Sequence, residues 1–135
     1  MNAAQEQLHE RVDRYLHEAF GELVKNAPNE PAFFVPLGRI GVRVEVEEID
    51  DHNAIVECYA WIAQQLTADE RLAAWLARRN AGMRFAALCV DDEGAVIVRH
   101  ALFADGLEKP VLARLVEVMA STADELDEEL RDSFA

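Results

Sequence analysis

Three side chains near the start of the chain have the spacing of a metal site. His9, Asp13 and His17 recur at every fourth position, which places them on one face of a helix. Zinc accepts imidazole and carboxylate ligands, but a structural zinc site has four ligands and usually includes thiolates. No fourth ligand is close in the sequence. We therefore interpret the three residues as the solvated flank of an amphipathic helix and expect no metal.

Two cysteines are the candidate nucleophiles. Cys58 and Cys89 could react with His52 or His100 as the general base. Reactive thiols usually lie at helix N-termini or in electropositive pockets, whereas these two lie in apolar runs that predict strands. We therefore expect buried thiols that stay reduced in the cytoplasm.

Carboxylates in the first half of the chain are candidates for a catalytic pair that acts as general acid and general base. Glu45 and Glu47 alternate with Arg39 and Arg43, and Glu57 follows in the next predicted strand. Because arginines interleave with these carboxylates on the polar face, cross-strand ion pairs are the simpler account. The six glycines are scattered and form no phosphate-binding loop, so we expect no cofactor.

The charge of the chain limits its partners. The 135 residues include 26 acidic and 13 basic ones, for a net charge of −13. Phosphate contacts need clustered lysine and arginine, so the composition argues against nucleic acid and against an anionic membrane surface. No apolar run approaches the roughly 20 residues of a membrane span, and the first residues lack the pattern of a signal peptide. We expect a cytoplasmic protein.

Residues 1–66 predict one helix and three strands. Apolar residues at helical spacing predict a helix over 4–26, which prolines and asparagines then interrupt. A short apolar run over 32–35 and alternating patterns over 40–47 and 54–62 predict strands. The last of these carries apolar side chains on both faces, which is typical of a central strand.

The second half predicts a helix, a hairpin and a long helix. Thr67 and Glu70 form a capping box for a helix that ends near Asn80 and Gly82, where a left-handed cap is expected. Runs over 85–90 and 95–103 flank an acidic turn with Gly94, which predicts a hairpin. A final helix begins near 108 with Pro110 in its first turn. The order α-β-β-β-α-β-β-α predicts an α+β fold in a single domain, residues 1–135.

The chain resembles the bacterial YbjN-like proteins, which are similar to type III secretion chaperones in fold. The resemblance rests on the capped helix over 67–76 with the following Asn80, the hairpin over 88–98, the strand exit over 101–107 and the segment over 122–126 of the last helix. It implies an antiparallel sheet with helices packed on one face, a homodimer, and a non-enzymatic role in binding another protein as a chaperone or regulator. It supplies no catalytic residues.

We therefore predict a protein-binding module that captures an extended segment in a groove or at a strand edge. The alternatives are a small enzyme that uses the two cysteines or the histidine–aspartate site, and a structural dimerisation domain without a peptide groove.

Five residues are candidates for the partner or dimer surface. Glu57, Tyr59 and Trp61 share one face of their strand, and aromatic side chains are enriched at interfaces. Leu126 and Leu130 continue an apolar stripe through the acidic end of the last helix. Either another surface buries these leucines or the helix end frays, because acidic groups oppose the helix dipole there.

Overall fold

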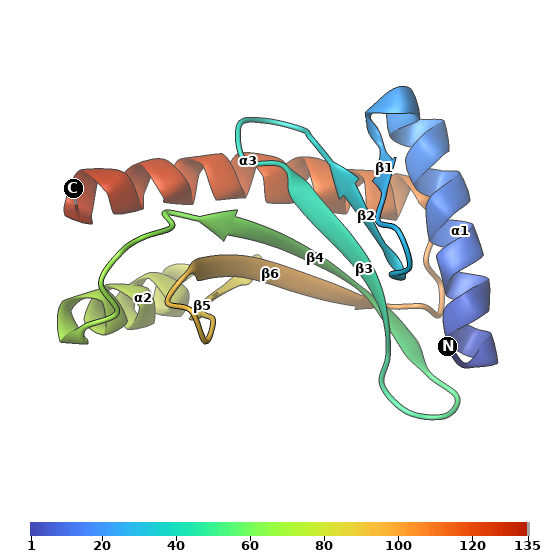
Figure 1. Ribbon diagram of the computed structural model, residues 1–135, viewed down its shortest axis with the longest axis horizontal. Helices are drawn as coiled ribbons and strands as arrows, with labels where there is room; N and C mark the ends of the chain where they lie inside the picture. Colours follow the sequence, from blue (N-terminus) through green and yellow to red (C-terminus); the bar gives the residue numbers. More distant parts are fainter. Residues whose placement is uncertain (135) are drawn as a thin grey trace.

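The computed structural model describes residues 1–134 and contains three helices and one six-stranded sheet (Figure 1). The helices are α1 (Ala3–Phe20), α2 (Glu70–Gly82) and α3 (Lys109–Phe134), with a short 3-10 helix, η1 (Gly21–Leu23). The strands are β1 (Lys25–Asn26), β2 (Ala32–Val35), β3 (Val42–Glu48), β4 (Ala54–Ile62), β5 (Ala87–Val90) and β6 (Val96–Phe103).

Every neighbouring pair of strands in the sheet is antiparallel, and the spatial order is β1-β2-β3-β4-β6-β5. The predicted α+β class and antiparallel sheet are confirmed. Strand β4 lies at the centre, paired with β3 on one side and β6 on the other. The two-residue strand β1 was not predicted, because two exposed residues carry no periodicity.

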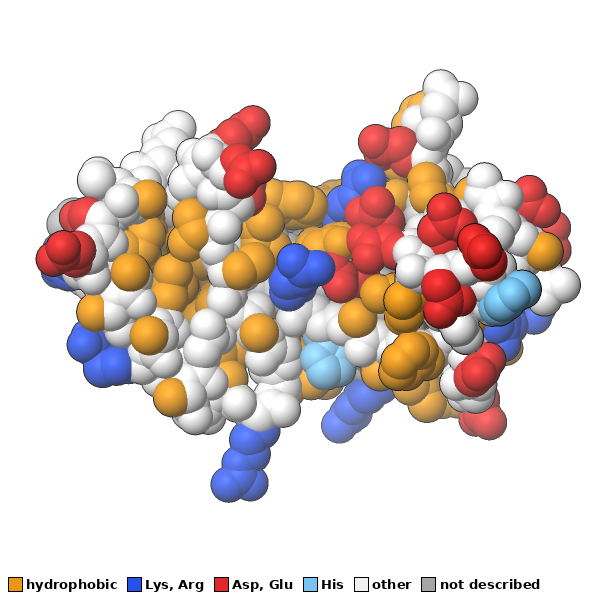
Figure 2. Space-filling model, turned by 90° about the horizontal axis from the view of Figure 1, so that it is seen from below, with side chains coloured by type: hydrophobic (Ala, Val, Ile, Leu, Met, Phe, Trp, Pro, Cys, Tyr) orange, Lys and Arg blue, Asp and Glu red, His pale blue; other side chains and the backbone are white. Residues whose placement is uncertain are grey.

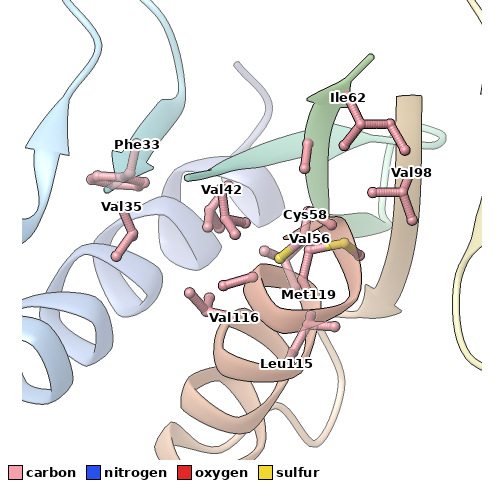
Figure 3. Packing of buried hydrophobic residues seen from close by; sticks show 14 of the residues in the cluster. Phe33, Val35, Val42, Val56, Cys58, Ile62, Val98, Leu115, Val116 and Met119 are labelled. Carbon is pink, nitrogen blue, oxygen red and sulfur yellow. The ribbon is translucent and has the colours of Figure 1, made fainter. Parts of the chain in front are cut away.

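Helices α1 and α3 cover one face of the sheet. In Figure 1, α3 runs along the length of the sheet and α1 crosses near the N-terminal end of α3. Figure 3 shows Met119 of α3 packed against Val56 and Cys58 of β4, all of which are fully buried. Helix α2 lies beside β5 and contacts α3 through an ion pair between Arg79 and Glu129 (2.9 Å). The alternating strands and the helical stripes thus bury their apolar sides against each other.

The first helix is shorter than the sequence predicted. It ends at Phe20, and Gly21 adopts a left-handed conformation with φ of +60°. Glycine adopts this conformation without the steric cost of a Cβ, so the helix can stop there. The apolar Leu23 and Val24, which extended the helical pattern, belong to η1 and the turn after it.

The caps of α2 also differ from the prediction. Asp69, rather than Thr67, is the N-cap, and its side chain accepts a hydrogen bond from the Leu72 amide (3.0 Å). No left-handed residue ends the helix, since Met83 follows with φ of −86°. Asn80 instead donates its side-chain amide to the Leu88 carbonyl (2.9 Å) and accepts from the Leu88 N–H (2.7 Å), which ties α2 to β5.

The acidic end of α3 is held by the rest of the chain. Asp124 accepts hydrogen bonds from the backbone amides of Arg39 (3.1 Å) and Ile40 (3.2 Å). Asp127 is fully buried and accepts from the Ala63 amide (2.7 Å). Of the two outcomes left open by the sequence, the structure shows a packed helix end.

Candidate functional site

Strand β6 extends beyond its neighbour β5 and leaves part of its edge unpaired. The β5–β6 ladder stops at the pair Ala87–Arg99, whereas β6 continues to Phe103. Backbone groups alternate between the two sides of a strand. Ala104 donates to the Ala54 carbonyl on the β4 side (3.1 Å), so the N–H and C=O groups of Ala101 and Phe103 point the other way. No strand pairs with them there within residues 1–134.

Outward backbone groups at two other places in the sheet are covered. Asn80 occupies the outward backbone groups of Leu88 on β5. On β3, the N–H of Val46 donates to the Pro31 carbonyl (2.8 Å), and its C=O accepts from the Gln5 side chain (2.9 Å). The end of β6 is therefore a place where a further strand could pair without displacing any of these contacts.

A mostly apolar groove of about 260 Å³ lies beside this edge, between β6 and the first half of α3. We call it the β6 edge groove, and it is lined by Phe85, His100, Leu102, Val111, Arg114, Leu115 and Val118. Its floor includes the buried Leu115, while the Val111 side chain is 47% exposed. The groove offers apolar surface within reach of the unpaired backbone groups of β6.

One wall of the groove depends on a strained turn. Ala86 adopts φ of +64°, an uncommon conformation for a residue with a Cβ. The turn takes the chain out of the sheet, and Phe85 stacks on His100 with ring centroids 4.6 Å apart. Arg99 and His100 lie on opposite faces of β6, because side chains alternate along a strand. His100 thus contributes to the groove, while Arg99 pairs with Glu57 on the other face.

The other face of the sheet carries the predicted surface residues of β4. Glu57, Tyr59 and Trp61 lie on this open face, with the Tyr59 and Trp61 rings 5.8 Å apart. Glu57 is 5% exposed and accepts a hydrogen bond from Arg99, whose guanidinium lies 5.3 Å from the Tyr59 ring centroid. The Tyr59 hydroxyl donates to Glu47. Burial, and then the hydrogen bonds to Glu47 and Glu57, raise the pKa of Tyr59 well above its ordinary value.

Hydrophobic and charged side chains are mixed on the surface in Figure 2, where the molecule is seen from below. Acidic side chains gather on the right-hand part, which in Figure 1 holds α1 and the β3–β4 loop.

Leu126 and Leu130 lie in the core rather than on a surface. Their side chains are 1% and 0% exposed, respectively, within a single chain. The apolar stripe of α3 is therefore buried in one core together with the sheet and the other helices. These leucines are not available to a partner while the chain keeps this fold.

The two cysteines have different surroundings. Cys58 is fully buried, and burial, with a smaller contribution from the charge of Glu57, raises the pKa of its thiol. It lies opposite His100 in the β4–β6 ladder, but a buried neutral thiol is a poor nucleophile. Cys89 is half-buried on β5, opposite Ile97, and its side chain lies beside the guanidinium of Arg99.

The three candidate metal ligands do not converge. His17 pairs with Asp13 (2.9 Å), whereas the His9 ring stacks on Phe33 at 5.0 Å. Residues 1–134 contain no group of three or more histidine, cysteine, aspartate or glutamate side chains placed to hold a metal ion. Arg43 pairs with Glu45 on the same strand (3.4 Å) and not across strands as predicted, whereas Glu57 pairs across strands with Arg99 of β6.

Comparison with known proteins identifies the family. Residues 6–135 match the family model TY-Chap1, described as T3SS (YopN, CesT) and YbjN peptide-binding chaperone 1. The chain belongs to this family. TY-Chap1 is a family of chaperone-type binding modules rather than of enzymes, so the predicted resemblance and the protein-binding class are confirmed.

A solved structure supports the fold of this TY-Chap1 protein. The crystal structure of YbjN from E. coli, described as a proposed transcription regulator, superimposes with a TM-score of 0.66 at 17% sequence identity. The alignment covers 93% of this chain and 92% of that one. The comparison with curated proteins found no match. Among residues 1–134, no helix has the length and apolar character to span a membrane.

Proposed function

We propose that this TY-Chap1 protein binds extended segments of other proteins by strand addition to β6. An added strand would pair with the outward N–H and C=O groups of Ala101 and Phe103. Side chains on one side of it would enter the β6 edge groove and cover the exposed Val111. The observation that carries the proposal is the unpaired end of β6 next to an apolar groove, in a chain of a peptide-binding family.

We also propose that the protein acts in the cytoplasm as a homodimer with a chaperone or regulatory role. The open face of the sheet, with Glu57, Tyr59 and Trp61, is the proposed contact between the two copies. Two observations support it: the aromatic pair is only partly covered, and both helices that pack on the sheet lie on the opposite face. Aromatic side chains bury large areas at interfaces at a low entropic cost.

Peptide binding is tested by changing the edge and the groove separately. Ala101→Pro removes an outward N–H and leaves the β4 ladder intact, since that N–H points away from β4. Val111→Glu places a charge in the groove. Val90→Glu is the matched control, because Val90 is also exposed but lies on β5, outside the groove. The ligands are a library of capped, extended apolar peptides, and binding is measured by fluorescence anisotropy.

We expect peptides from the library to bind the native protein, and both edge variants to bind at least about tenfold more weakly, which corresponds to about 1.4 kcal/mol. Val90→Glu should bind like the native protein. If the native protein and the three variants bind the peptides equally, the proposal that peptides bind at the β6 edge is wrong. If none binds any peptide while the dimer persists, the alternative of a dimerisation domain without a groove is favoured.

A further inference from the structure

A second hollow lies far from the β6 edge groove, at the opposite end of α3. It has a volume of about 430 Å³ and is lined by Arg39, Ile40, Trp61, Ala63, Gln64, Gln65, Leu66, Asp127 and Arg131. On α3, Asp127 follows Val118, the last groove residue of that helix, by nine positions, which separates the two sites by roughly 14 Å at 1.5 Å per residue.

One buried carboxylate organises two arginines in this hollow. Asp127 is 0% exposed and lies 2.9 Å from Arg131 Nε and 3.5 Å from Arg39 Nη1. The two arginine side chains are 64% and 58% exposed, so they reach from the buried carboxylate towards solvent. Arg131 contacts Asp127 only through Nε, and within residues 1–134 its two Nη groups have no hydrogen-bond partner. These groups form a donor pair that suits a carboxylate.

The loop on the other side of the hollow is held in a strained conformation. Ala63 and Gln65 adopt φ of +43° and +73°, and neither is glycine. Such conformations cost free energy and persist only where the surroundings fix them. Here the Ala63 amide donates to Asp127 Oδ1 (2.7 Å). The same carboxylate therefore fixes the loop and aligns the arginines, which makes the hollow preorganised.

The lining of the hollow has a polar part and an apolar part. Arg39, Arg131 and the two glutamine amides provide donors, and the amide oxygens provide acceptors. Ile40, Trp61 and Leu66 provide apolar surface. A ligand that matches both parts has a carboxylate, a neighbouring peptide group and an apolar side chain.

We propose that this hollow binds the C-terminal residue of a protein or peptide, with its free carboxylate on Arg131 and Arg39. Its apolar side chain lies against Ile40 and Leu66, and its last peptide group pairs with the glutamine amides. The proposal does not depend on strand addition at β6. In a chain with net charge −13, long-range repulsion opposes anionic ligands, so local donors must provide the selectivity.

The test compares acetyl-Gly-Ser-Leu carrying a free C-terminal carboxylate with the same tripeptide as its C-terminal amide, by isothermal titration calorimetry. We expect the acid to bind about tenfold more tightly or better, because hydrogen bonds to charged groups are the strong ones. Arg131→Gln should remove this preference. Arg78→Gln removes the same charge from an exposed position outside the hollow and should leave the preference unchanged. Because Trp61 also belongs to the open face of the sheet, the test relies on Arg131.

Equal binding of acid and amide, or equal effects of the two arginine variants, would overturn the proposal. So would acetate binding as tightly as the tripeptide, since the apolar part would then contribute nothing. Ala101→Pro separates this site from the β6 edge groove: it should leave tripeptide binding intact, and a parallel loss would place the tripeptide at β6 and overturn the proposal.

Discussion

At the scale of single residues, Asp127 joins three parts of the fold through one carboxylate. It accepts from the Ala63 amide on one oxygen and contacts Arg39 and Arg131 through the other. The arginines are more than half exposed, so each ion pair contributes little to stability. The Ala63 amide is the more costly partner to lose, because Ala63 is 4% exposed and its N–H would be left without an acceptor.

We therefore expect Asp127→Ala to lower the free energy of unfolding by about 2 kcal/mol, the cost of an unsatisfied buried donor. Asp127→Asn keeps an acceptor for Ala63 and should cost less. Glu128→Ala, at an exposed neighbouring position, is the control and should change stability by under about 0.5 kcal/mol. Urea denaturation followed by circular dichroism measures all three. Equal stabilities of the Asp127 and Glu128 variants would contradict this account of the buried carboxylate.

The buried thiol of Cys58 makes stability depend on pH in the alkaline range. Its pKa is raised in the folded state above the ordinary value of 9.0. Above that pH the unfolded chain loses the proton while the folded chain keeps it, so the unfolded state is favoured. One such group lowers the free energy of unfolding by about 1.4 kcal/mol between about pH 8 and about pH 10.

Cys58→Ala should remove this part of the pH dependence, whatever its effect on stability at neutral pH. The measurement is urea denaturation of both proteins at the two pH values. Tyr59 and Cys89 are present in both proteins, so their contributions to the pH dependence of stability cancel when the two proteins are compared. Identical losses of stability in the two proteins would show that Cys58 ionises in the folded state.

At the scale of elements, the β2–β3 loop requires glycine where α3 approaches it. Gly38 has φ of +73°, and a Cβ there would lie 2.7 Å from Asp124 Oδ2. That carboxylate accepts the Arg39 and Ile40 amides, so moving it would loosen the contact between the loop and α3. Gly82, at the end of α2, has open space around it and no left-handed φ.

The two glycines should therefore respond oppositely to alanine. Gly38→Ala should destabilise the protein by about 1–3 kcal/mol, through backbone strain and the displaced carboxylate. Gly82→Ala should be neutral or stabilising by up to about 1 kcal/mol, because alanine has the higher helix propensity. Thermal unfolding measures both. A destabilised Gly82→Ala protein would mean that the helix end needs glycine after all, as the sequence pattern first indicated.

The helices and strands with a clear hydrophobic periodicity could be predicted from the sequence, whereas the contacts between them could not. Strand β4 has the predicted bounds, because its alternation is strong over nine residues. The caps of α2 were wrong, because Thr67, Asp69 and Asn80 are all capping types and only tertiary contacts decide which of them caps. The unequal lengths of β5 and β6 were visible in the hairpin pattern. That β6 is open on one side depends on strand order, which no local pattern encodes.

The candidate sites show the same division. Glu57, Tyr59 and Trp61 were placed correctly on one face, because β-strand alternation fixes it. The hollow at Asp127 was missed, because it joins Arg39 to a helix almost 90 residues away, and the sequence pattern there indicated only an apolar stripe through an acidic helix end.

At the scale of the whole molecule, the high negative charge acts against self-association. Each chain carries a net charge of −13, so two copies repel each other over distances comparable to the Debye length. The proposed interface contains the aromatic side chains of Tyr59 and Trp61, and salt screens the repulsion between the chains without weakening the burial of these rings. Dimer formation by this protein should therefore strengthen with ionic strength, the reverse of an interface held by opposite charges.

We expect light scattering to report a mass near twice the 15.1 kDa of the chain, with a dissociation constant that falls between about 0.05 M and about 0.5 M salt. Trp61→Ser should weaken the dimer by about 2 kcal/mol, or roughly thirtyfold, as for an aromatic residue central to an interface. Leu23→Ser removes another exposed apolar side chain, on η1, and should leave the dimer unchanged. A mass of one chain at every salt concentration, or equal effects of the two variants, would remove the open face of the sheet as the interface. Peptide binding at β6 would then have to be explained for a monomer, which the independent position of the β6 edge groove allows.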